Sequence, residues 1–493
     1  MNSTMTARLR IVGRTLDPTA DWSRLRGKAL YSGLAEVLGK PEERNAYLVL
    51  AVLRAAIPTV ERVRAFTRAW QISGVEPVMR RVVASQRATP GRRAHVTVSS
   101  GVLVDVTDTS TSDFVTGIQR VARETITRWS LDHDITLVRW VRGASILREL
   151  NDDERARVVG ATGSQTAETR EVIVPFGSTF VLPEIAVDRA RADRVRTVAL
   201  FGSARSVAVG FDCIPVTTAE TAGDSMPGAF SRYLSALAPF SAIAAISGSS
   251  AQEFFGWKRM LAGAGLSGPD IVDLSLPFES GSATAEQIET VRRQLGLVGE
   301  RIVLSVGSHE PRKNHLNLLH AAELCWRAGH EFTLVFAGGN AWKSERFFET
   351  ADELRRHGRR IVMLTGVEDV VIWSLYSMAT VSVFCSLNEG FGLPVVESLA
   401  SGTPVITSDF GSMRELGEGH GALTVDPRSP ADLATALDRI FSDESLYGRL
   451  LAETGTLPHS TWEDYARRLW GRVETPASPS TAPDDPPRKS RTR

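Results

Sequence analysis

The stretch NEGFGLPVVESLASGTPVITSD, residues 388–409, contains a glycine-rich loop, the start of a helix and an apolar strand. Two carboxylates in it, Glu389 and Glu397, are separated by seven residues. Glycines and a proline predict a loop around Glu389, while VVESLASG predicts a helix that carries Glu397 in its first turn. The sequence therefore predicts that both acids border one pocket.

This pocket suits a nucleotide sugar. Glycines allow a backbone to approach a ligand closely, and the free N–H groups at a helix start favour a diphosphate. Two carboxylates would repel an isolated anion, whereas vicinal hydroxyls on a sugar and on a ribose offer each acid two hydrogen-bond donors.

On both sides of this stretch, apolar strands alternate with helices, which favours parallel α/β units. One series runs from Val96 to about residue 276, and a second runs from Arg301 to Phe441. Six strands in the second series would complete a Rossmann-like sheet. We therefore predict an α/β protein with two Rossmann-like domains that face a cleft.

The sequence lacks the motifs of dinucleotide-binding enzymes, nucleotide triphosphatases and α/β-hydrolases. Neither series begins with strand, G-x-G-x-x-G and helix, and the chain has no Walker A sequence and no G-x-S-x-G elbow. Asp132-His133-Asp134 matches the D-x-D pattern of metal-dependent glycosyltransferases, but it precedes a strand, so we interpret it as a helix-to-strand turn.

Composition indicates a globular chain. The 493 residues carry 57 basic and 57 acidic side chains, which gives no global argument for nucleic acid binding. Three separate cysteines predict neither disulfides nor a zinc site, and the start region shows no signal peptide. No apolar run approaches the roughly 20 residues of a membrane span. We expect a cytoplasmic protein.

Residues 1–97 are different, with 17 Lys and Arg against 7 Asp and Glu. Val60, Val63, Phe66 and Trp70 are spaced three or four apart, which predicts amphipathic helices. Two interpretations stay open: helices packed on the main body with a solvated basic face, or peripheral contact with the inner face of an anionic membrane, to which Trp70 would contribute.

The pattern E-x7-E with GFGLP inside it resembles the signature of the family-4 retaining glycosyltransferases, which have the GT-B fold. VLSVGSHEPRKNH (303–315), VMLTGVEDVVIWSLYSMA (362–379) and TGIQRVARE (116–124) resemble further motifs of this family in the same order. The resemblance covers residues 100–470, and it is closest to bacterial mannosyltransferases of polysaccharide and O-antigen assembly.

The resemblance assigns roles in donor binding. Arg312 and Lys313 would hold the diphosphate and stabilise its departure, Glu389 would accept hydroxyls of the transferred sugar, and Glu397 would hold the ribose. These roles make Arg312, Lys313 and Glu389 the catalytic candidates. The other donor-binding candidates are Gly390, Phe391, Gly392, Leu393 and, near the base, Val367.

The N-terminal half gives weaker signals. FDCIP (211–215) resembles an H-D-x-I-P stretch of bacterial relatives, but Phe211 stands where those proteins have histidine. Asp212 is retained. The acceptor or cleft candidates are Asp212, Glu184, Thr116 and Gly117.

The predicted domain organisation has six parts. They are a basic helical extension (1–97), an acceptor domain (98–280), a linker (281–300), a nucleotide-sugar domain (301–455), a helix crossing back to the acceptor domain (456–474) and a disordered tail (475–493).

Family membership would imply transfer of a hexose with retained configuration, without a bound metal or other cofactor, from a nucleoside-diphosphate sugar. GDP-mannose is the favoured donor, and a glycan or lipid-linked molecule is the expected acceptor. Two alternatives remain: synthesis of a soluble disaccharide, and a GT-B scaffold that binds a sugar nucleotide without turnover.

Overall fold

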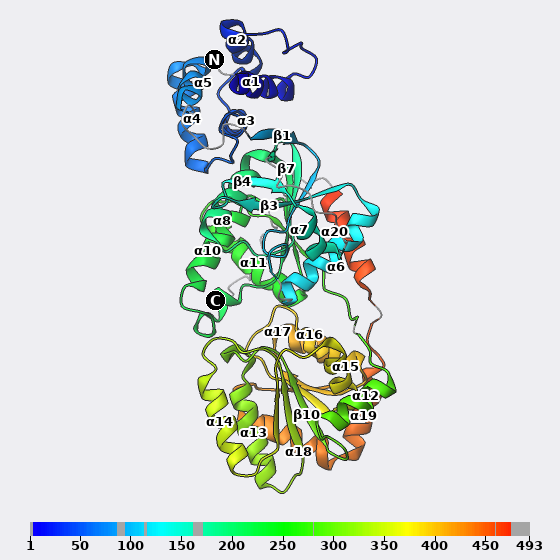
Figure 1. The fold of residues 1–493 in the computed structure, drawn as a ribbon. Helices are drawn as coiled ribbons and strands as arrows, with labels where there is room; N and C mark the ends of the chain where they lie inside the picture. Colours follow the sequence, from blue (N-terminus) through cyan, green and yellow to red (C-terminus); the bar gives the residue numbers. More distant parts are fainter. Residues whose placement is uncertain are drawn as a thin grey trace, which may run out of the picture.

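The computed structural model describes residues 3–85, 94–112, 116–160, 171–279, 281–458 and 460–474. Two sheet domains lie one above the other, and a layer of helices covers the far end of the first (Figure 1). The predicted tail, residues 475–493, lies outside the described residues.

The N-terminal domain is built on a seven-stranded sheet of order β4-β3-β2-β6-β7-β8-β9. Its strand pairs are parallel except β3 with β4, and a separate parallel pair joins β1 to β5. Its elements are β1 (His95–Ser99), β2 (Val102–Asp105), α6 (Gly117–Asp132), β3 (Ile135–Val141), β4 (Ile146–Glu149), α7 (Asp152–Val159), β5 (Glu171–Pro175), β6 (Ser178–Leu182), α8 (Arg189–Thr197), a π-helical turn η3 (Val198–Gly202), β7 (Ser203–Gly210), α9 (Ile214–Thr217), η4 (Ala219–Thr221), α10 (Met226–Leu237), β8 (Ala242–Ala245), α11 (Gly248–Gly263) and β9 (Asp270–Asp273).

The C-terminal domain contains a six-stranded parallel sheet of order β12-β11-β10-β13-β14-β15. This is the order of a doubly wound nucleotide-binding fold. Its elements are α12 (Ala285–Gln294), β10 (Ile302–Val306), η5 (Pro311–Lys313), α13 (His315–Arg327), β11 (Thr333–Ala337), α14 (Glu345–Arg356), β12 (Ile361–Leu364), α15 (Asp369–Met378), β13 (Val381–Phe384), α16 (Leu393–Ala400), β14 (Val405–Ser408), α17 (Gly411–Gly417), β15 (Ala422–Val425), α18 (Pro430–Ser442) and α19 (Glu444–Thr454).

The central strands of this domain are buried along their length, as strands covered on both faces by helices must be. All five residues of β11 and all four of β13 are buried. The sixth strand, β15, is the one that the sequence reading did not name. Together the two sheets confirm the predicted fold class.

The last helix, α20 (Trp462–Glu474), leaves the C-terminal domain and packs beside α6 of the N-terminal domain (Figure 1). Trp129 Nε1 donates a hydrogen bond to the carbonyl oxygen of Ala466 at 2.9 Å, and the Trp129 and Trp470 rings have centroids 5.3 Å apart. Between α6 and β3, His133 stacks on Trp470 in the helix-to-strand turn expected for Asp132-His133-Asp134.

Within the described residues 3–85, the chain forms five helices before the first sheet: α1 (Ser3–Leu16), α2 (Gly27–Leu38), α3 (Glu43–Arg54), α4 (Val60–Ser73) and α5 (Val75–Ser85). Their apolar residues belong to the same buried cluster as residues of the seven-stranded sheet. Trp70 is only 4% exposed in that cluster, so its expected contribution to membrane contact is wrong: the apolar face of α4 points into the protein. Membrane contact through the exposed basic side chains stays a prediction.

The described residues include no helix that is long and apolar enough to cross a membrane.

The shared core gives a first prediction. Leu48 in α3 is fully buried, so Leu48→Ala should lower the free energy of unfolding by about 2–5 kcal/mol. Ile72 in α4 is 85% exposed, and Ile72→Ala should change it by less than about 0.5 kcal/mol. Urea unfolding followed by tryptophan fluorescence would compare them. Equal, small effects would show that the helical layer is not part of the core.

Candidate active site

The predicted site lies at the switch point of the C-terminal sheet, where the order of its strands reverses. Strands β10 and β13 are neighbours, with β11 and β12 on one side and β14 and β15 on the other. Ligands of open parallel sheets bind at the carboxyl ends of such strands. The loop after β10 carries Arg312 and Lys313, and the loop after β13 carries Glu389.

These three side chains contact one another. Arg312 Nη1 lies 2.5 Å from Glu389 Oε2, and Lys313 Nζ donates to Glu389 Oε1 at 2.7 Å. Arg312 also pairs with Glu310 at 2.5 Å and donates to the carbonyl oxygen of Asn388 at 2.9 Å. The acid and the two bases that the sequence assigned to different parts of a donor therefore form one ionic cluster.

The cluster is largely buried: the side chains of Arg312, Lys313 and Glu389 are 17%, 12% and 10% exposed. Burial alone would raise the pKa of Glu389, but Arg312 and Lys313 outweigh it and lower that pKa to about 2. Burial lowers the pKa of Lys313, and Glu389 opposes this. An ionised carboxylate thus occupies the position between two cations that an anionic ligand would also favour.

The glycine-rich loop has its predicted place before α16. Gly392 adopts φ +105° as the residue that precedes this helix, a conformation that favours glycine. Phe391 is buried, with its ring centroid 6.3 Å from that of Phe278. Leu393 begins the helix and is half-buried.

The backbone of Gly390 lies close against the N-terminal domain. A Cβ there would lie 2.5 Å from the carbonyl oxygen of Phe211 and 3.0 Å from Asp212 Oδ2. The Gly390 carbonyl oxygen accepts hydrogen bonds from Ser247 Oγ at 2.6 Å and Ser250 Oγ at 2.8 Å. The N-terminal domain therefore holds the loop that carries Glu389.

Glu397 lies on α16, as expected, but not in its first turn, because the helix begins two residues earlier than VVESLASG predicts, at Leu393. Glu397 also faces a residue that sequence reasoning did not single out. Arg120 Nη1, on α6 of the other domain, donates to Glu397 Oε1 at 2.9 Å. Tyr376 donates its hydroxyl to Glu397 Oε2 at 3.2 Å. Burial raises the pKa of Glu397, against the opposing effects of Arg120 and Tyr376.

The signal for Arg120 was present in the motif TGIQR, where it follows the glycine loop. Its partner lies 277 residues away, and no short pattern links the two. Val367 lies half-buried in the loop between β12 and α15, the helix that supplies Tyr376.

Asp212 and Arg312 both line a pocket of about 530 Å³ whose walls come from both sheet domains. Burial raises the pKa of Asp212 to about 6, although Arg312 acts in the opposite direction. The neighbouring Phe211, in the place of the expected histidine, is buried in the apolar core and offers no titratable group.

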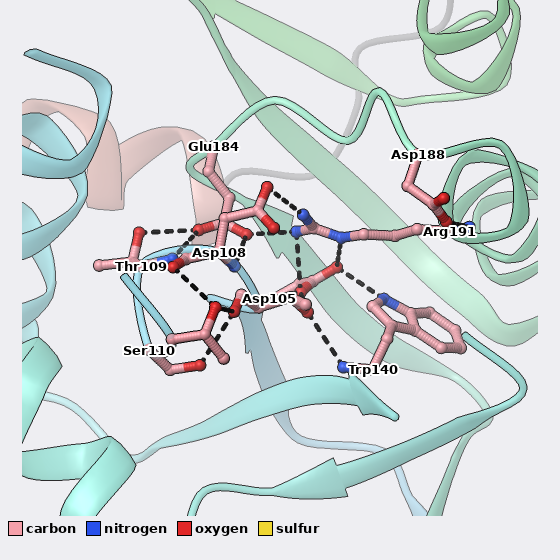
Figure 2. Close-up of polar contacts among 10 residues, drawn as sticks. Asp105, Asp108, Thr109, Ser110, Trp140, Glu184, Asp188 and Arg191 are labelled. Atoms are coloured by element: carbon pink, nitrogen blue, oxygen red, sulfur yellow. Dashed lines mark hydrogen bonds and ion pairs between the residues drawn. The ribbon is translucent and has the colours of Figure 1, made fainter. Parts of the chain in front are cut away.

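Glu184 also borders this pocket, but its oxygens are committed to the protein (Figure 2). It is 1% exposed, pairs with Arg191, and accepts hydrogen bonds from the backbone N–H groups of Asp108 (2.8 Å) and Thr109 (2.9 Å). Burial raises its pKa against the effect of Arg191. Through these hydrogen bonds Glu184 holds the loop that follows β2 in place.

Arg191 is the centre of this network (Figure 2). Its guanidinium lies 3.0 Å from Asp105 and 2.8 Å from Asp108, and Trp140 Nε1 donates to Asp105 at 2.7 Å. The single positive charge of Arg191 therefore pairs with the carboxylates of Asp105, Asp108 and Glu184. Acidic groups outnumber basic groups in this network.

Thr116 caps α6 by accepting a hydrogen bond from the Gln119 backbone N–H, and it also lines the pocket. Gly117, the first residue of α6, faces Leu393: a Cβ there would lie 3.8 Å from Leu393 Cδ1. In the described parts of the chain, no group of three or more His, Cys, Asp or Glu residues is arranged to hold a metal ion.

Comparison with known proteins agrees with this architecture. Residues 287–454 match the family described as Glycosyl transferases group 1. The chain is 23% identical over 428 residues to the serotype-specific mannosyltransferase WbdA of Escherichia coli, which covers 82% of this chain and 49% of WbdA. It is 29% identical over 210 residues to a mannosylfructose-phosphate synthase of Agrobacterium fabrum, covering 40% of this chain and 44% of that protein. The chain spans about half the length, or less, of these curated relatives.

Among solved structures, Anabaena Alr3699/HepE in complex with UDP and glucose superposes with a TM-score of 0.54 at 15% sequence identity, covering 76% of this chain and 99% of HepE. A likeness at this identity shows the fold: two Rossmann-like domains in the GT-B arrangement.

The ionic cluster gives a second prediction. Glu389→Gln leaves Arg312 and Lys313 without the carboxylate that separates them, and should lower the free energy of unfolding by about 3–5 kcal/mol. Inorganic pyrophosphate should restore more stability to this variant than to the unaltered protein. Thermal melts would measure both effects. Glu453→Gln, which alters an exposed pair with Arg449 at 3.7 Å, should cost less than about 1 kcal/mol. A Glu389 variant no weaker than this control would contradict the assignment.

The contact between Arg120 and Glu397 gives a third prediction, on how stability depends on pH. The groups that act on Glu397 are Arg120, Tyr376 and Asp369, of which Asp369 raises its pKa further. Without Arg120 the folded-state pKa moves further above its unfolded value, so stability is lost as the pH rises through it. The melting temperature of Arg120→Ala should therefore fall further below that of the unaltered protein at pH 8 than at pH 5.

Two variants control this experiment. Arg120→Lys keeps the positive charge and should reduce the deficit, and adding Arg120→Ala to a Glu397→Gln protein should give a deficit independent of pH. A pH-independent deficit in the Arg120→Ala single variant would show that Arg120 acts by packing alone.

Proposed function

We propose that this chain is a retaining glycosyltransferase that moves a hexose from a nucleoside-diphosphate sugar to a glycan or lipid-linked acceptor. Support comes from the match of residues 287–454 to the family described as Glycosyl transferases group 1 and from the GT-B fold. The observation that carries the proposal is the cluster of Arg312, Lys313 and Glu389 at the switch point of the C-terminal sheet. A site of two cations and a carboxylate beside a helix start suits a sugar diphosphate.

Donor binding would rearrange this cluster. The diphosphate would take the place of Glu389 between Arg312 and Lys313, so that both cations remain paired in a dry site. The released carboxylate would then accept hydroxyls of the transferred sugar, which attaches to that diphosphate. This exchange reconciles the cluster with the role that the sequence suggested for Glu389.

In the transfer step, the bond between the anomeric carbon and the leaving diphosphate oxygen breaks while the acceptor oxygen bonds to the same face of the sugar. The acceptor hydroxyl gives its proton to the leaving diphosphate. Arg312 and Lys313 stabilise the charge that develops on that oxygen, and the cleft excludes water that would hydrolyse the donor. The charge is met by side chains, so the proposal requires no divalent metal and no other cofactor.

GDP-mannose is the donor that we propose. Support comes from the resemblance to O-antigen mannosyltransferases and from the name of WbdA. HepE, whose structure contains UDP and glucose, supports the nucleotide-sugar class but is too distant in sequence to indicate the base.

A second candidate is a synthase with a soluble acceptor, because the mannosylfructose-phosphate synthase is among the relatives. The two candidates differ in where the hexose arrives: in extractable lipid-linked glycan or in a water-soluble product.

The test, and the fourth prediction, is transfer from radiolabelled GDP-mannose, with UDP-glucose in parallel, to bacterial membrane extracts in the presence of EDTA. Label should appear in lipid-linked glycan. Lys313→Ala should lower kcat by about 10²–10³-fold, because it removes one preorganised stabilising group, whereas Lys40→Ala, on the exposed surface of the helical layer, should not.

Label in a soluble disaccharide would favour the second candidate, and nucleotide binding without transfer would favour a non-catalytic scaffold. Activity lost in EDTA and restored by magnesium would contradict the metal-free mechanism.

A further inference from the structure

The pocket of about 530 Å³ beside the proposed donor site has an unusual lining for a carbohydrate site. Most of its wall comes from the N-terminal domain, and Arg312 and Trp342 complete it from the C-terminal domain. Trp342 Nε1 donates to the carbonyl oxygen of Thr221 at 3.1 Å, which ties the two sides together. The apolar side chains of the lining include Ile118, Ile185, Val187, Ile214, Met226 and Phe230.

Polar groups such as Thr116, Gln119 and Asp212 occupy part of the wall, but its larger, apolar part offers no hydrogen-bond partner to a polyol. Each hydroxyl buried against aliphatic and aromatic side chains loses its hydrogen bonds to water without replacement, whereas an alkyl segment gains from leaving water. The pocket therefore favours an apolar occupant over a free sugar.

The charges of the lining exclude a phosphorylated occupant. Asp108, Glu184 and Asp212 contribute three carboxylates, of which Asp108 and Glu184 pair with Arg191 behind the wall. Among the described lining residues the one basic side chain is Arg312, which pairs with Glu389 and Glu310 and which the donor diphosphate would occupy during transfer. A phosphate would meet like charges in a poorly hydrated space, without a free cation to pair with.

The pocket is continuous with the proposed reaction site. Asp212 lines the pocket and its Oδ2 approaches Gly390, in the loop that carries Glu389. An acceptor hydroxyl placed beside Asp212 would leave the remainder of the acceptor in contact with the apolar wall.

We propose that this pocket is the acceptor subsite and that it binds an uncharged acceptor whose accepting sugar is attached to an apolar aglycone, while sugar phosphates are excluded. This inference rests on the proposed glycosyl transfer and narrows its acceptor class. Ile118, Met226 and Phe230 contact the aglycone, and Asp212 faces the accepting sugar.

The fifth prediction is a binding experiment on the full chain, by isothermal titration with and without GDP. The probes are n-octyl α-D-mannopyranoside, below its micelle concentration, methyl α-D-mannopyranoside and mannose 6-phosphate. The octyl glycoside should bind at least about tenfold more tightly than the methyl glycoside, because its chain leaves water. Mannose 6-phosphate should bind more weakly than the methyl glycoside. Equal affinities of the two glycosides, or tighter binding of the phosphate, would overturn the proposal.

Two matched variants show where the octyl chain binds. Met226 lines the pocket, and Met226→Gln should remove most of the octyl preference while methyl glycoside and GDP binding stay unchanged. Met260 is 74% exposed and outside the lining, so Met260→Gln should keep the preference. Loss in both variants, or in neither, would place the chain elsewhere and overturn the proposal.

The experiment separates this inference from the proposed function. A protein that binds neither GDP nor UDP would contradict nucleotide-sugar transfer, while the octyl and methyl glycosides compared without nucleotide still test the pocket.

Discussion

The largely buried ion cluster of Glu389 with Arg312 and Lys313 is the constraint on which the active-site region depends. Its members come from the loops after two strands that are adjacent in the sheet but separated by about 75 residues of chain, so the cluster forms only when β10 pairs with β13. Neither cation could remain buried without an anion, because the loss of hydration would exceed what the backbone alone returns. The fold therefore delivers two charged loops to one point, and the need to neutralise them fixes the geometry there.

The same loop connects the two domains. Ser247 and Ser250, at the start of α11, donate to the carbonyl oxygen of Gly390, next to Glu389 in sequence. Glu415 on α17 accepts hydrogen bonds from the backbone N–H groups of Gly248 and Ser249, both at 3.1 Å, where a helix start favours negative charge. With the pair of Arg120 and Glu397, these contacts surround the proposed donor site with groups from both domains. Any movement of one domain against the other must therefore alter the environment of Glu389 and Glu397, so domain closure would change the proposed donor site.

Sequence reasoning succeeded where the signal was local. The glycine loop, the existence of the helix that carries Glu397 and the turn after α6 all follow from patterns shorter than about 20 residues, and the confirmed fold class follows from repetition of such patterns. It failed where partners are distant. Arg120 contacts Glu397 only because tertiary packing brings the two domains together. Tertiary packing also places Glu184 against Arg191 and the loop after β2. Trp70 shows a different limit: an amphipathic helix has an apolar face in either case, and its sequence cannot tell whether protein or membrane covers that face. Only the shared core of α4 and the first sheet decides this.

The two domains divide the electrostatics of the cleft between them. The C-terminal side contributes Arg312 and Lys313, where a diphosphate would bind, and the N-terminal side contributes Asp108, Glu184 and Asp212 to a wall that is otherwise apolar. Arg312 lies at the boundary, in contact with the acids of its own domain and close enough to Asp212 to oppose the rise of its pKa. An anion in the N-terminal pocket would lie near these carboxylates without a cation of its own to pair with. A neutral, partly apolar molecule needs no such partner. Because Arg312 and Lys313 lie on one side of the cleft and the largely apolar wall with its carboxylates lies on the other, a charged donor and an uncharged acceptor would each favour one side. The bond between them would form where Asp212 approaches the loop of Glu389.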